Sequence, residues 1–248
     1  MEKIKFCFVA VVLSIVTNVF AQTTSKSDGF NSLFIQWNPS TIKPSEGEST
    51  SFTGFSLGYN HDFNLVKDVP LFLEVGAALQ YSYKSKDQTL EEDKVKAWGL
   101  EVNDYRMWTE KISLLSVKVP INILYKHYFP NSNIAIAPYI GVSVRGNIFG
   151  RYKVDVNKDL KVKVERMIAS VTTASGWTPF PLEKDFDLFS KSDMGEDNVW
   201  KRFQIGWQVG ANVYFYKFYA GVSYGNDFTE ISNECKIRTI SATIGYVF

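Results

Sequence analysis

The sequence predicts an all-β protein: an eight-stranded antiparallel transmembrane β-barrel with long extracellular loops and short periplasmic turns. Three observations lead to this fold class. Apolar and polar residues alternate through eight separate segments, which is the period of a β-strand. The connections between these segments alternate between long and short. The last segment places an apolar residue at every second position and ends on an aromatic residue, Phe248.

The eight segments form an even number, as bacterial barrels require. Long connections follow the first, third, fifth and seventh segments, and short connections follow the second, fourth and sixth. Residues 64–68, 130–132 and 216–217 are therefore predicted turns, and residues 85–112 and 150–201 are predicted surface loops. The predicted strands are 31–37, 52–63, 71–83, 113–128, 133–149, 202–215, 217–228 and 237–248.

The composition of the two strand faces separates a membrane barrel from a soluble lipocalin-like barrel, whose apolar residues point inside. In the third segment Leu73, Val75 and Leu79 share one face, while Glu74 and Gln80 share the other. Across the segments the polar face is rich in small and uncharged residues. Such residues suit the crowded interior of a narrow barrel better than a surface in contact with water. We therefore expect the apolar face to meet lipid, and the first and last strands to pair so that no edge is left open.

The N-terminus predicts a cleaved signal peptide over residues 1–21. Lys3 and Lys5 form a short basic stretch, residues 6–16 are apolar except for Ser14, and residues 19–21 fit a signal-peptidase site. A retained helical anchor is the alternative, but the apolar run is shorter than the roughly 20 residues that a spanning helix needs. The mature chain, residues 22–248, is then predicted to be one outer-membrane barrel domain.

Charge and cysteine content exclude other classes. The whole chain has a formal net charge of +1, and cleavage of the signal removes more basic than acidic residues. The sequence has no basic stripe, so nucleic acid is not an expected partner. The mature chain keeps a single cysteine, Cys235, which excludes an intramolecular disulfide bond.

Four stretches make the sequence resemble the small outer-membrane β-barrel domain family, which is often labelled porin family: residues 116–129, 137–142, 206–210 and 245–248. The resemblance implies a location in the bacterial outer membrane, with outer-membrane lipid as a partner. It constrains function only loosely. The terminal strand, with Ile244, Tyr246 and Phe248 on one face, resembles the signal that the barrel-assembly machinery recognises during biogenesis.

Eight strands enclose an interior that side chains just fill, whereas water-filled porins use about 16 to 18 strands. We therefore expect an interior network of paired polar groups, in which Glu74 and Lys126 form an ion pair. A narrow polar path for ions is the alternative. Alternation assigns the following residues to this interior: Glu74, Lys118, Asn122, Lys126, Arg145, Gln204, Gln208 and Asp227.

The sequence predicts no catalytic site, no cofactor and no metal site. Hydrolysis would need a nucleophile beside a base, and the two histidines, His61 and His127, lie near predicted periplasmic strand ends among aromatic residues. Acidic residues near positions 185–187 and 193–197 leave calcium binding open, although they form no Asp-x-Asp-x-Asp-Gly loop.

The long loop 150–201 is where a distinctive function is expected. Residues 152–156, 157–159 and 160–164 predict a strand, a turn and a strand. The aromatic residues of the loop either fold over the barrel mouth or form a recognition surface for a protein or glycan. We therefore predict a structural or surface-interaction role, with a narrow channel as the alternative and an outer-membrane hydrolase as a third possibility. The candidate recognition aromatics are Trp177, Phe180, Phe186, Phe189 and Trp200.

Overall fold

The structure of the chain is a computed structural model. The predicted signal peptide and Trp177 lie outside the residues that the structure describes. The described ranges are 29–44, 49–97, 105–171, 180–196 and 198–248.

The chain divides into two compact units, which are described separately. The first, called the barrel unit, comprises the chain up to Ser82, Leu114–Phe149 and Trp200–Phe248. The second, called the loop unit, comprises Tyr83–Ser113 and Gly150–Val199. Three strands contribute residues to both units.

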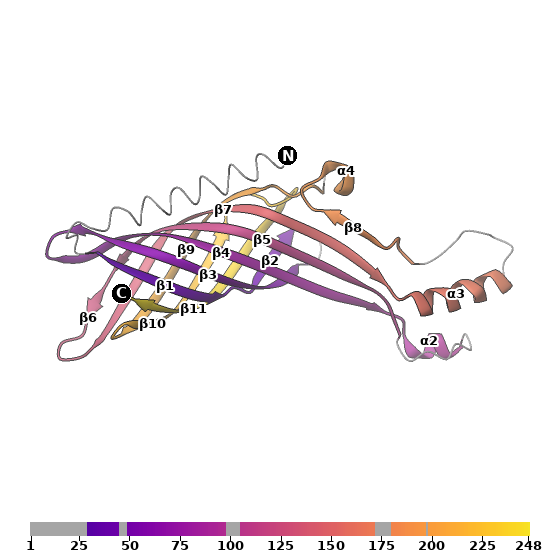
Figure 1. The fold of residues 1–248 in the computed structure, drawn as a ribbon, viewed down its shortest axis with the longest axis horizontal. Coiled ribbons are helices and arrows are strands. Elements are labelled where there is room, and N and C mark those ends of the chain that lie inside the picture. Colours follow the sequence, from indigo (N-terminus) through magenta and orange to yellow (C-terminus); the bar gives the residue numbers. More distant parts are fainter. Residues whose placement is uncertain (1–28, 45–48, 98–104, 172–179, 197) are drawn as a thin grey trace. The chain divides into compact units, whose positions relative to one another are not determined.

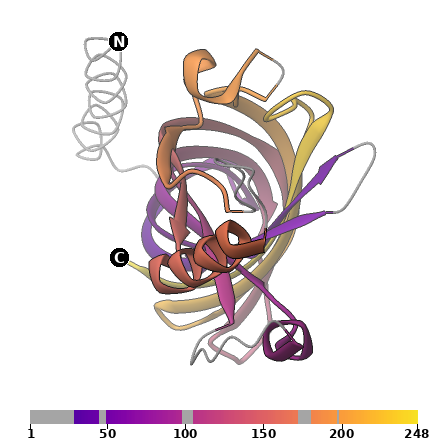
Figure 2. The same cartoon turned by 90° about the vertical axis from the view of Figure 1, so that its right-hand side faces the viewer.

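Eight strands close into a ring in the order β1, β11, β10, β9, β7, β5, β4 and β3, and β3 pairs with β1 to complete it (Figures 1 and 2). The pairing of β1 with β11 is antiparallel, from Ser32 opposite Val247 to Trp37 opposite Ala242. The predicted eight-stranded antiparallel barrel and its closure by the first and last strands are confirmed. The ring strands are β1 (Phe30–Trp37), β3 (Thr50–Val66), β4 (Val69–Thr89), β5 (Arg106–Tyr125), β7 (Ile134–Val156), β9 (Phe203–Phe215), β10 (Phe218–Asp227) and β11 (Cys235–Val247).

A short strand, β2 (Ser40–Pro44), continues the first strand where a long connection was predicted. It pairs with β11 and β3, which are also the neighbours of β1. The chain bends at Asn38 and Pro39, where proline has no backbone N–H to donate. The Asn38 N–H donates to the Gly54 carbonyl at 2.7 Å and keeps the bend attached to β3.

The faces of the barrel are arranged as the sequence predicted. On β11, Ile244 is 70% exposed on the outer side, whereas the adjacent Thr243, on the inner side, is 8% exposed. On β9, Ile205 is 47% exposed and Gln204 is 1% exposed. Apolar side chains outside and small polar ones inside are the reverse of a soluble barrel, so the lipocalin-like alternative is not supported.

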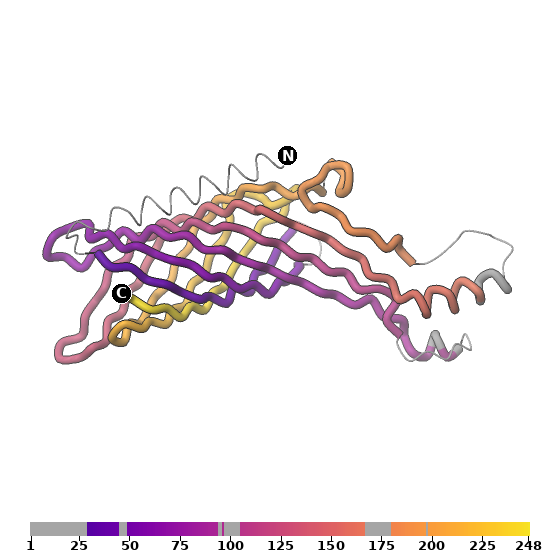
Figure 3. Tube along the Cα trace, in the orientation of Figure 1, coloured from indigo at the N-terminus to yellow at the C-terminus, as the bar shows by residue number. Residues whose placement is uncertain are grey.

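The three short connections are tight turns, which the Cα trace in Figure 3 follows at one end of the barrel. Lys67 and Asp68 join β3 to β4, and Tyr216 and Lys217 join β9 to β10. Asp68 and Tyr216 adopt positive φ angles of 65° and 54°. Two-residue hairpins favour such angles because their twist then matches that of the strands.

Two predicted loops are largely regular structure. Strand β4 continues to Thr89 and β5 begins at Arg106, so both ends of segment 85–112 are strand. Strand β7 continues to Val156, well into segment 150–201. The remaining elements of the described chain are α2 (Glu92–Ala97), β6 (His127–Tyr128), α3 (Lys158–Val171), β8 (Lys184–Asp187) and α4 (Lys191–Met194). None of the described helices is long and apolar enough to span a membrane.

The predicted hairpin over residues 152–164 is wrong, because α3 replaces its second strand. Asn157 caps this helix by accepting a hydrogen bond from the Leu160 N–H at 3.1 Å. Leu160 and Val164 are both buried with Phe180. Residues four apart lie on one face of a helix as well as on one face of a strand, so the Leu-Lys-Val-Lys-Val pattern fits both structures. Packing on the helical face decides between them.

Candidate functional site

A chain of hydrogen bonds crosses the interior of the barrel unit and joins four strands. Lys118 Nζ donates to Gln208 Oε1 at 2.7 Å, and Gln208 Nε2 donates to Asn122 Oδ1 at 2.7 Å. Asn122 Nδ2 then donates to Glu74 Oε1 at 2.6 Å, while Asn60 Nδ2 donates to Glu74 Oε2 at 2.9 Å. Both oxygens of the buried Glu74 carboxylate therefore accept amide hydrogen bonds.

A second polar cluster lies in the same unit. Arg145 Nη1 contacts Asp227 Oδ2 at 3.3 Å, and both side chains are buried. Asn147 accepts a hydrogen bond from Ser116 at 2.7 Å and donates one to Gln204 Oε1 at 2.7 Å. This cluster accounts for the remaining interior residues assigned by alternation, apart from Lys126.

The predicted ion pair between Glu74 and Lys126 is wrong. The strand register places Asn122 beside Glu74. The Lys126 N–H bonds the carbonyl of Pro70, which lies four residues before Glu74 on β4. Four residues of strand span about 13 Å. Lys126 Nζ instead lies over aromatic rings, 3.9 Å from the Tyr214 centroid and 4.3 Å from the Phe30 centroid.

An apolar cluster fills the interior around Lys126. Phe72, Leu124, Tyr214 and Tyr219 come from four different strands and are all buried, and Phe30 packs against them. The Phe30 and Phe72 rings meet edge to face at 5.3 Å. Sequence reasoning missed this cluster, although the aromatic residues at inward positions of β4, β9 and β10 are its signal.

The cavity found inside the barrel unit is small. It measures about 40 Å³ and is lined by Glu74, Lys118, Asn122 and Gln208, with Tyr139 among its aromatic residues. That volume holds about two or three water molecules. In the described part of the barrel unit, hydrogen-bonded polar groups and aromatic rings thus pack around a cavity that holds only a few water molecules.

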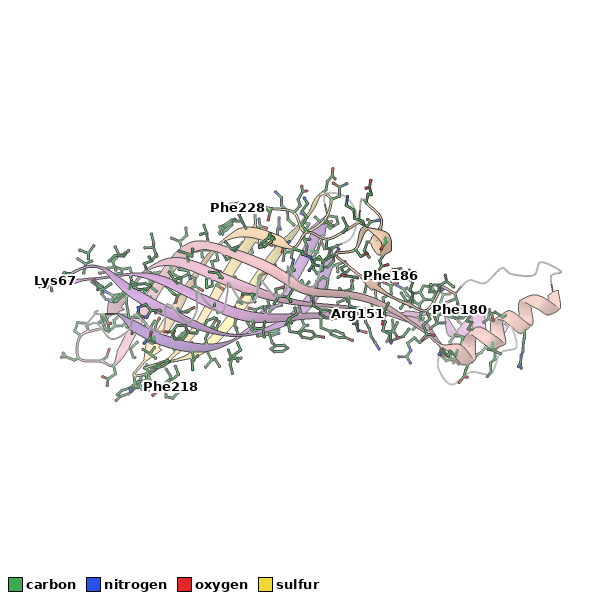
Figure 4. The ribbon with its side chains drawn as sticks, turned by 45° about the horizontal axis from the view of Figure 1, so that its top comes forward. Lys67, Arg151, Phe180, Phe186, Phe218 and Phe228 are labelled. Carbon is green, nitrogen blue, oxygen red and sulfur yellow. The ribbon has the colours of Figure 1, made fainter. Side chains whose placement is uncertain are left out.

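The predicted recognition aromatics are in different environments. Phe180 is 5% exposed inside the small core of the loop unit, so its assignment to a recognition surface is wrong. Phe186 lies 5.7 Å from the Tyr152 ring, and Phe189 lies against Gly150. Trp200 belongs to the barrel unit and contacts Phe52 edge to face at 6.3 Å. Figure 4 labels Phe180 and Phe186 in the loop unit.

The sheet of the loop unit carries a lattice of ion pairs on one face. Asp155 on β7 contacts Lys111 on β5 at 2.7 Å and its strand neighbour Lys153 at 2.5 Å. Hydrogen bonds from these two lysines lower the pKa of the Asp155 carboxyl below its usual value. Thr109 donates to Asp87 at 2.6 Å on the same face and joins β5 to β4.

The histidines make structural contacts. His61 is buried and its Nδ1 lies 2.6 Å from Asn31 Oδ1, which also accepts a hydrogen bond from Tyr59. His127 stacks edge to face on Phe129 at 5.1 Å. Among the described residues no three acidic, histidine or cysteine side chains are grouped to hold a metal ion, and Asp197 lies outside that part of the chain.

The three residues predicted as an assembly signal lie on the outer face at the C-terminal end of β11. Ile244, Tyr246 and Phe248 are all exposed, and the Tyr246 and Phe248 rings stack at 6.5 Å. The backbone N–H and carbonyl groups of Phe248 bond those of Asn31 on β1. This end of β11 is therefore part of the seam that closes the ring.

No protein-family model matches the sequence, and the search of curated proteins finds no match. The fold is similar to solved structures of small outer-membrane β-barrel proteins. One is the attachment invasion locus protein Ail of Yersinia pestis in complex with a heparin analogue, with 15% identity, a TM-score of 0.42, and coverage of 89% of this chain and 99% of that one. Another is Neisserial surface protein A, with 13% identity, a TM-score of 0.39, and coverage of 88% and 97%. A third is the outer-membrane enzyme PagL, with 11% identity, a TM-score of 0.41, and coverage of 85% and 98%.

Proposed function

We propose that this protein is an integral outer-membrane β-barrel that conducts no solutes and acts through its loop unit, as a surface-interaction or structural protein. The observation that carries the proposal is the packed interior of the barrel unit. Glu74, Asn122, Gln208 and Lys118 are bonded to one another, and the remaining cavity holds only a few waters. Passage of a solute through the barrel would require this hydrogen-bonded network to open.

The outer surface of the barrel supports placement in lipid. The outward positions of the ring strands are occupied by large exposed apolar residues, of which Leu57, Ile140 and Ile240 are examples. A soluble protein rarely exposes contiguous apolar patches of this kind. Exposed aromatic residues near the short turns, including Phe215 and Phe218, fit the girdle found at a membrane interface. Figure 4 labels Phe218.

The loop unit supports the interaction role because it has a core of its own. Leu160, Val164 and Phe180 are buried together, with Trp108 and Val156 packed against them. Such a core can hold the surface residues of the loop unit in a fixed arrangement, as a binding surface requires. The long connections that form this unit follow β4 and β7, and the short turns lie at the other ends of these strands, as expected for surface loops and periplasmic turns.

The proposal includes no catalytic activity. The two histidines, the usual general bases of hydrolases, make contacts with Asn31 and Phe129 that suit structural roles. It does include recognition by the barrel-assembly machinery through Ile244, Tyr246 and Phe248, because these residues are exposed on the outer face of the closing strand.

Cysteine labelling in cells tests the membrane placement. In a Cys235→Ser background, Leu182→Cys marks the loop unit and Lys67→Cys marks a short turn, and both positions are exposed. A membrane-impermeant maleimide should label position 182 in intact cells, and position 67 only after the outer membrane is permeabilised. Labelling of position 67 alone in intact cells would mean that the protein has the opposite orientation in the membrane. Recovery of both variants in a soluble fraction would contradict insertion.

A further inference from the structure

The sheet of the loop unit has two faces of different character, and the strand register defines them. On β7 and β8, Tyr152 lies opposite Phe186 and Val154 lies opposite Lys184. The Asn157 N–H bonds the Met107 carbonyl, which sets β5 beside β7. The contact between Thr109 and Asp87 sets β4 beside β5. Alternation then places the odd-numbered residues of β4, β5 and β7 on one face and the even-numbered ones on the other.

The odd-numbered face is the ion-pair lattice described above. Asp155 holds Lys111 and Lys153, and Asp185 on β8 lies opposite Lys153. Each of these two lysines therefore lies beside a carboxylate of the same strand or of a neighbouring strand. This face therefore has little charge to offer to an anionic partner.

The even-numbered face, called here the lysine–aromatic face, is different. It carries three lysines, Arg106 and one carboxylate, Glu110, around three aromatic rings. Lys184 Nζ lies 4.8 Å above the Phe186 ring, and this ring is tilted by 32° against Tyr152. Besides Arg106 and Glu110, the face is formed by Lys84, Lys86, Trp108, Tyr152, Lys184 and Phe186.

Lys84, Lys86 and Glu110 lie close enough to influence one another. Burial lowers the pKa of Lys84, and the positive charge of Lys86 lowers it further, while Glu110 opposes the shift. Burial raises the pKa of Tyr152, and Glu110 adds to that increase. Lys86 and Lys184 are exposed. The face thus combines clustered positive charge with partly exposed rings.

We propose that the lysine–aromatic face binds an acidic carbohydrate, whose sugar rings lie on Tyr152 and Phe186 and whose sulfate or carboxylate groups bind Lys86 and Lys184. The inference rests on the proposed surface-interaction function and assigns it a ligand class. Aromatic rings offer flat apolar contact to the C–H faces of sugars, and ammonium groups form charge-assisted hydrogen bonds with sulfate or carboxylate.

The free edge of the same sheet disfavours an extended peptide as the ligand. A peptide that adds a strand needs open backbone groups along the edge strand. Strand β8 has four residues, and the Asp187 N–H is already bonded to the Asp193 carboxylate at 3.0 Å. The α4 segment that supplies Asp193 therefore caps this edge, and the exposed lysines and half-buried rings of the lysine–aromatic face remain as the surface for a ligand.

The test measures binding of the full-length protein, held in nanodiscs of neutral phosphatidylcholine, to three polysaccharides. Dextran sulfate and alginate supply sulfate and carboxylate groups, and neutral dextran is their uncharged counterpart. Interferometry should show salt-sensitive binding to one or both acidic polymers and no binding to dextran. The double variant Lys86→Gln/Lys184→Gln should weaken this binding about tenfold, as expected for two partly solvated charge contacts.

The matched control is Lys158→Gln/Lys191→Gln. It removes the same charge from two exposed lysines of the loop unit that lie off the sheet, where they contact Glu183 and Glu196. Its binding should change less than twofold. Tyr152→Leu keeps the net charge and should also weaken binding, which separates ring stacking from charge alone.

The outcomes separate this inference from the proposed function. Equal losses in the two double variants would reduce the effect to non-specific charge and overturn the inference. Absence of binding to both acidic polymers would also overturn it. If cysteine labelling still exposes position 182 on intact cells, the surface role stands without this ligand class. If labelling fails as well, both are wrong.

Discussion

Removing a side chain from the barrel interior tests the assignment of inner and outer faces most quantitatively. Leu124 is 0% exposed in the apolar cluster, and its neighbour on β5, Ile123, is 51% exposed on the outer face. Leu124→Ala removes three carbons, which costs about 2.4 kcal/mol in transfer free energy. A cavity of up to about 80 Å³ adds as much as about 2 kcal/mol, because the rigid barrel cannot collapse onto it.

Ile123→Ala is the matched control because it also removes three carbons. Lipid or detergent fills the space at the outer face, so no cavity forms. Its loss in unfolding free energy should be about 2.4 kcal/mol or less. We therefore predict that Leu124→Ala is the more destabilising change by about 1 to 2 kcal/mol.

The assay is urea unfolding of the refolded protein in lipid vesicles, followed by tryptophan fluorescence and by the change in electrophoretic mobility between folded and boiled samples. Both variants are compared with the unaltered protein under one set of conditions. An Ile123→Ala loss equal to or greater than the Leu124→Ala loss would refute the packed interior at this position.

Three further predictions concern the loop unit and the barrel seam. Leu160→Ala should make the loop unit sensitive to protease while the barrel stays folded. Val162→Ala, at an exposed position of the same helix, should leave the protease sensitivity unchanged. Limited proteolysis followed by mass spectrometry checks both variants. The pKa of Asp155 is lowered in the folded state, so the stabilising effect of its carboxylate should be complete above the unfolded pKa of about 3.9 and be lost as the pH falls through the lower folded pKa. Hydrogen exchange of β5 and β7 across this pH range should show the loss. The variant Asp155→Asn should abolish this pH dependence. Phe248→Ala should slow assembly in cells, seen as accumulation of unfolded protein in pulse-chase samples, and wild-type kinetics would contradict the proposed assembly signal.

The strands of the barrel were predictable because membrane placement imposes a strong period-two pattern. Ile205 and Gln204 illustrate this, since one faces outward and the other inward at adjacent positions. Strand ends were less predictable. Lys86 and Asp87 lie in a segment that was predicted as a loop, but β4 continues through them, and Thr109 of its partner β5 donates a hydrogen bond to Asp87.

Two wrong predictions show what the local sequence pattern cannot specify. Residues 160–164, the first part of α3, were predicted as a strand because their sequence satisfies both periods, whereas the Asn157 cap and the contacts with Phe180 favour the helix. The partner of Lys126 was wrong because alternation gives the face of a residue and not its position along the neighbouring strand. The aromatic rings around Lys126 come from β1 and β9, which are distant in sequence from β5.

The central claim, a barrel that is closed by its own interior, is tested most directly by conductance in a planar bilayer. The refolded mature protein and a variant lacking residues 157–199 are measured side by side. Since the obstruction lies among residues such as Glu74, Gln208 and Leu124, both proteins should be silent across the usual range of voltages. Discrete current steps from either protein would contradict the account and favour a narrow channel.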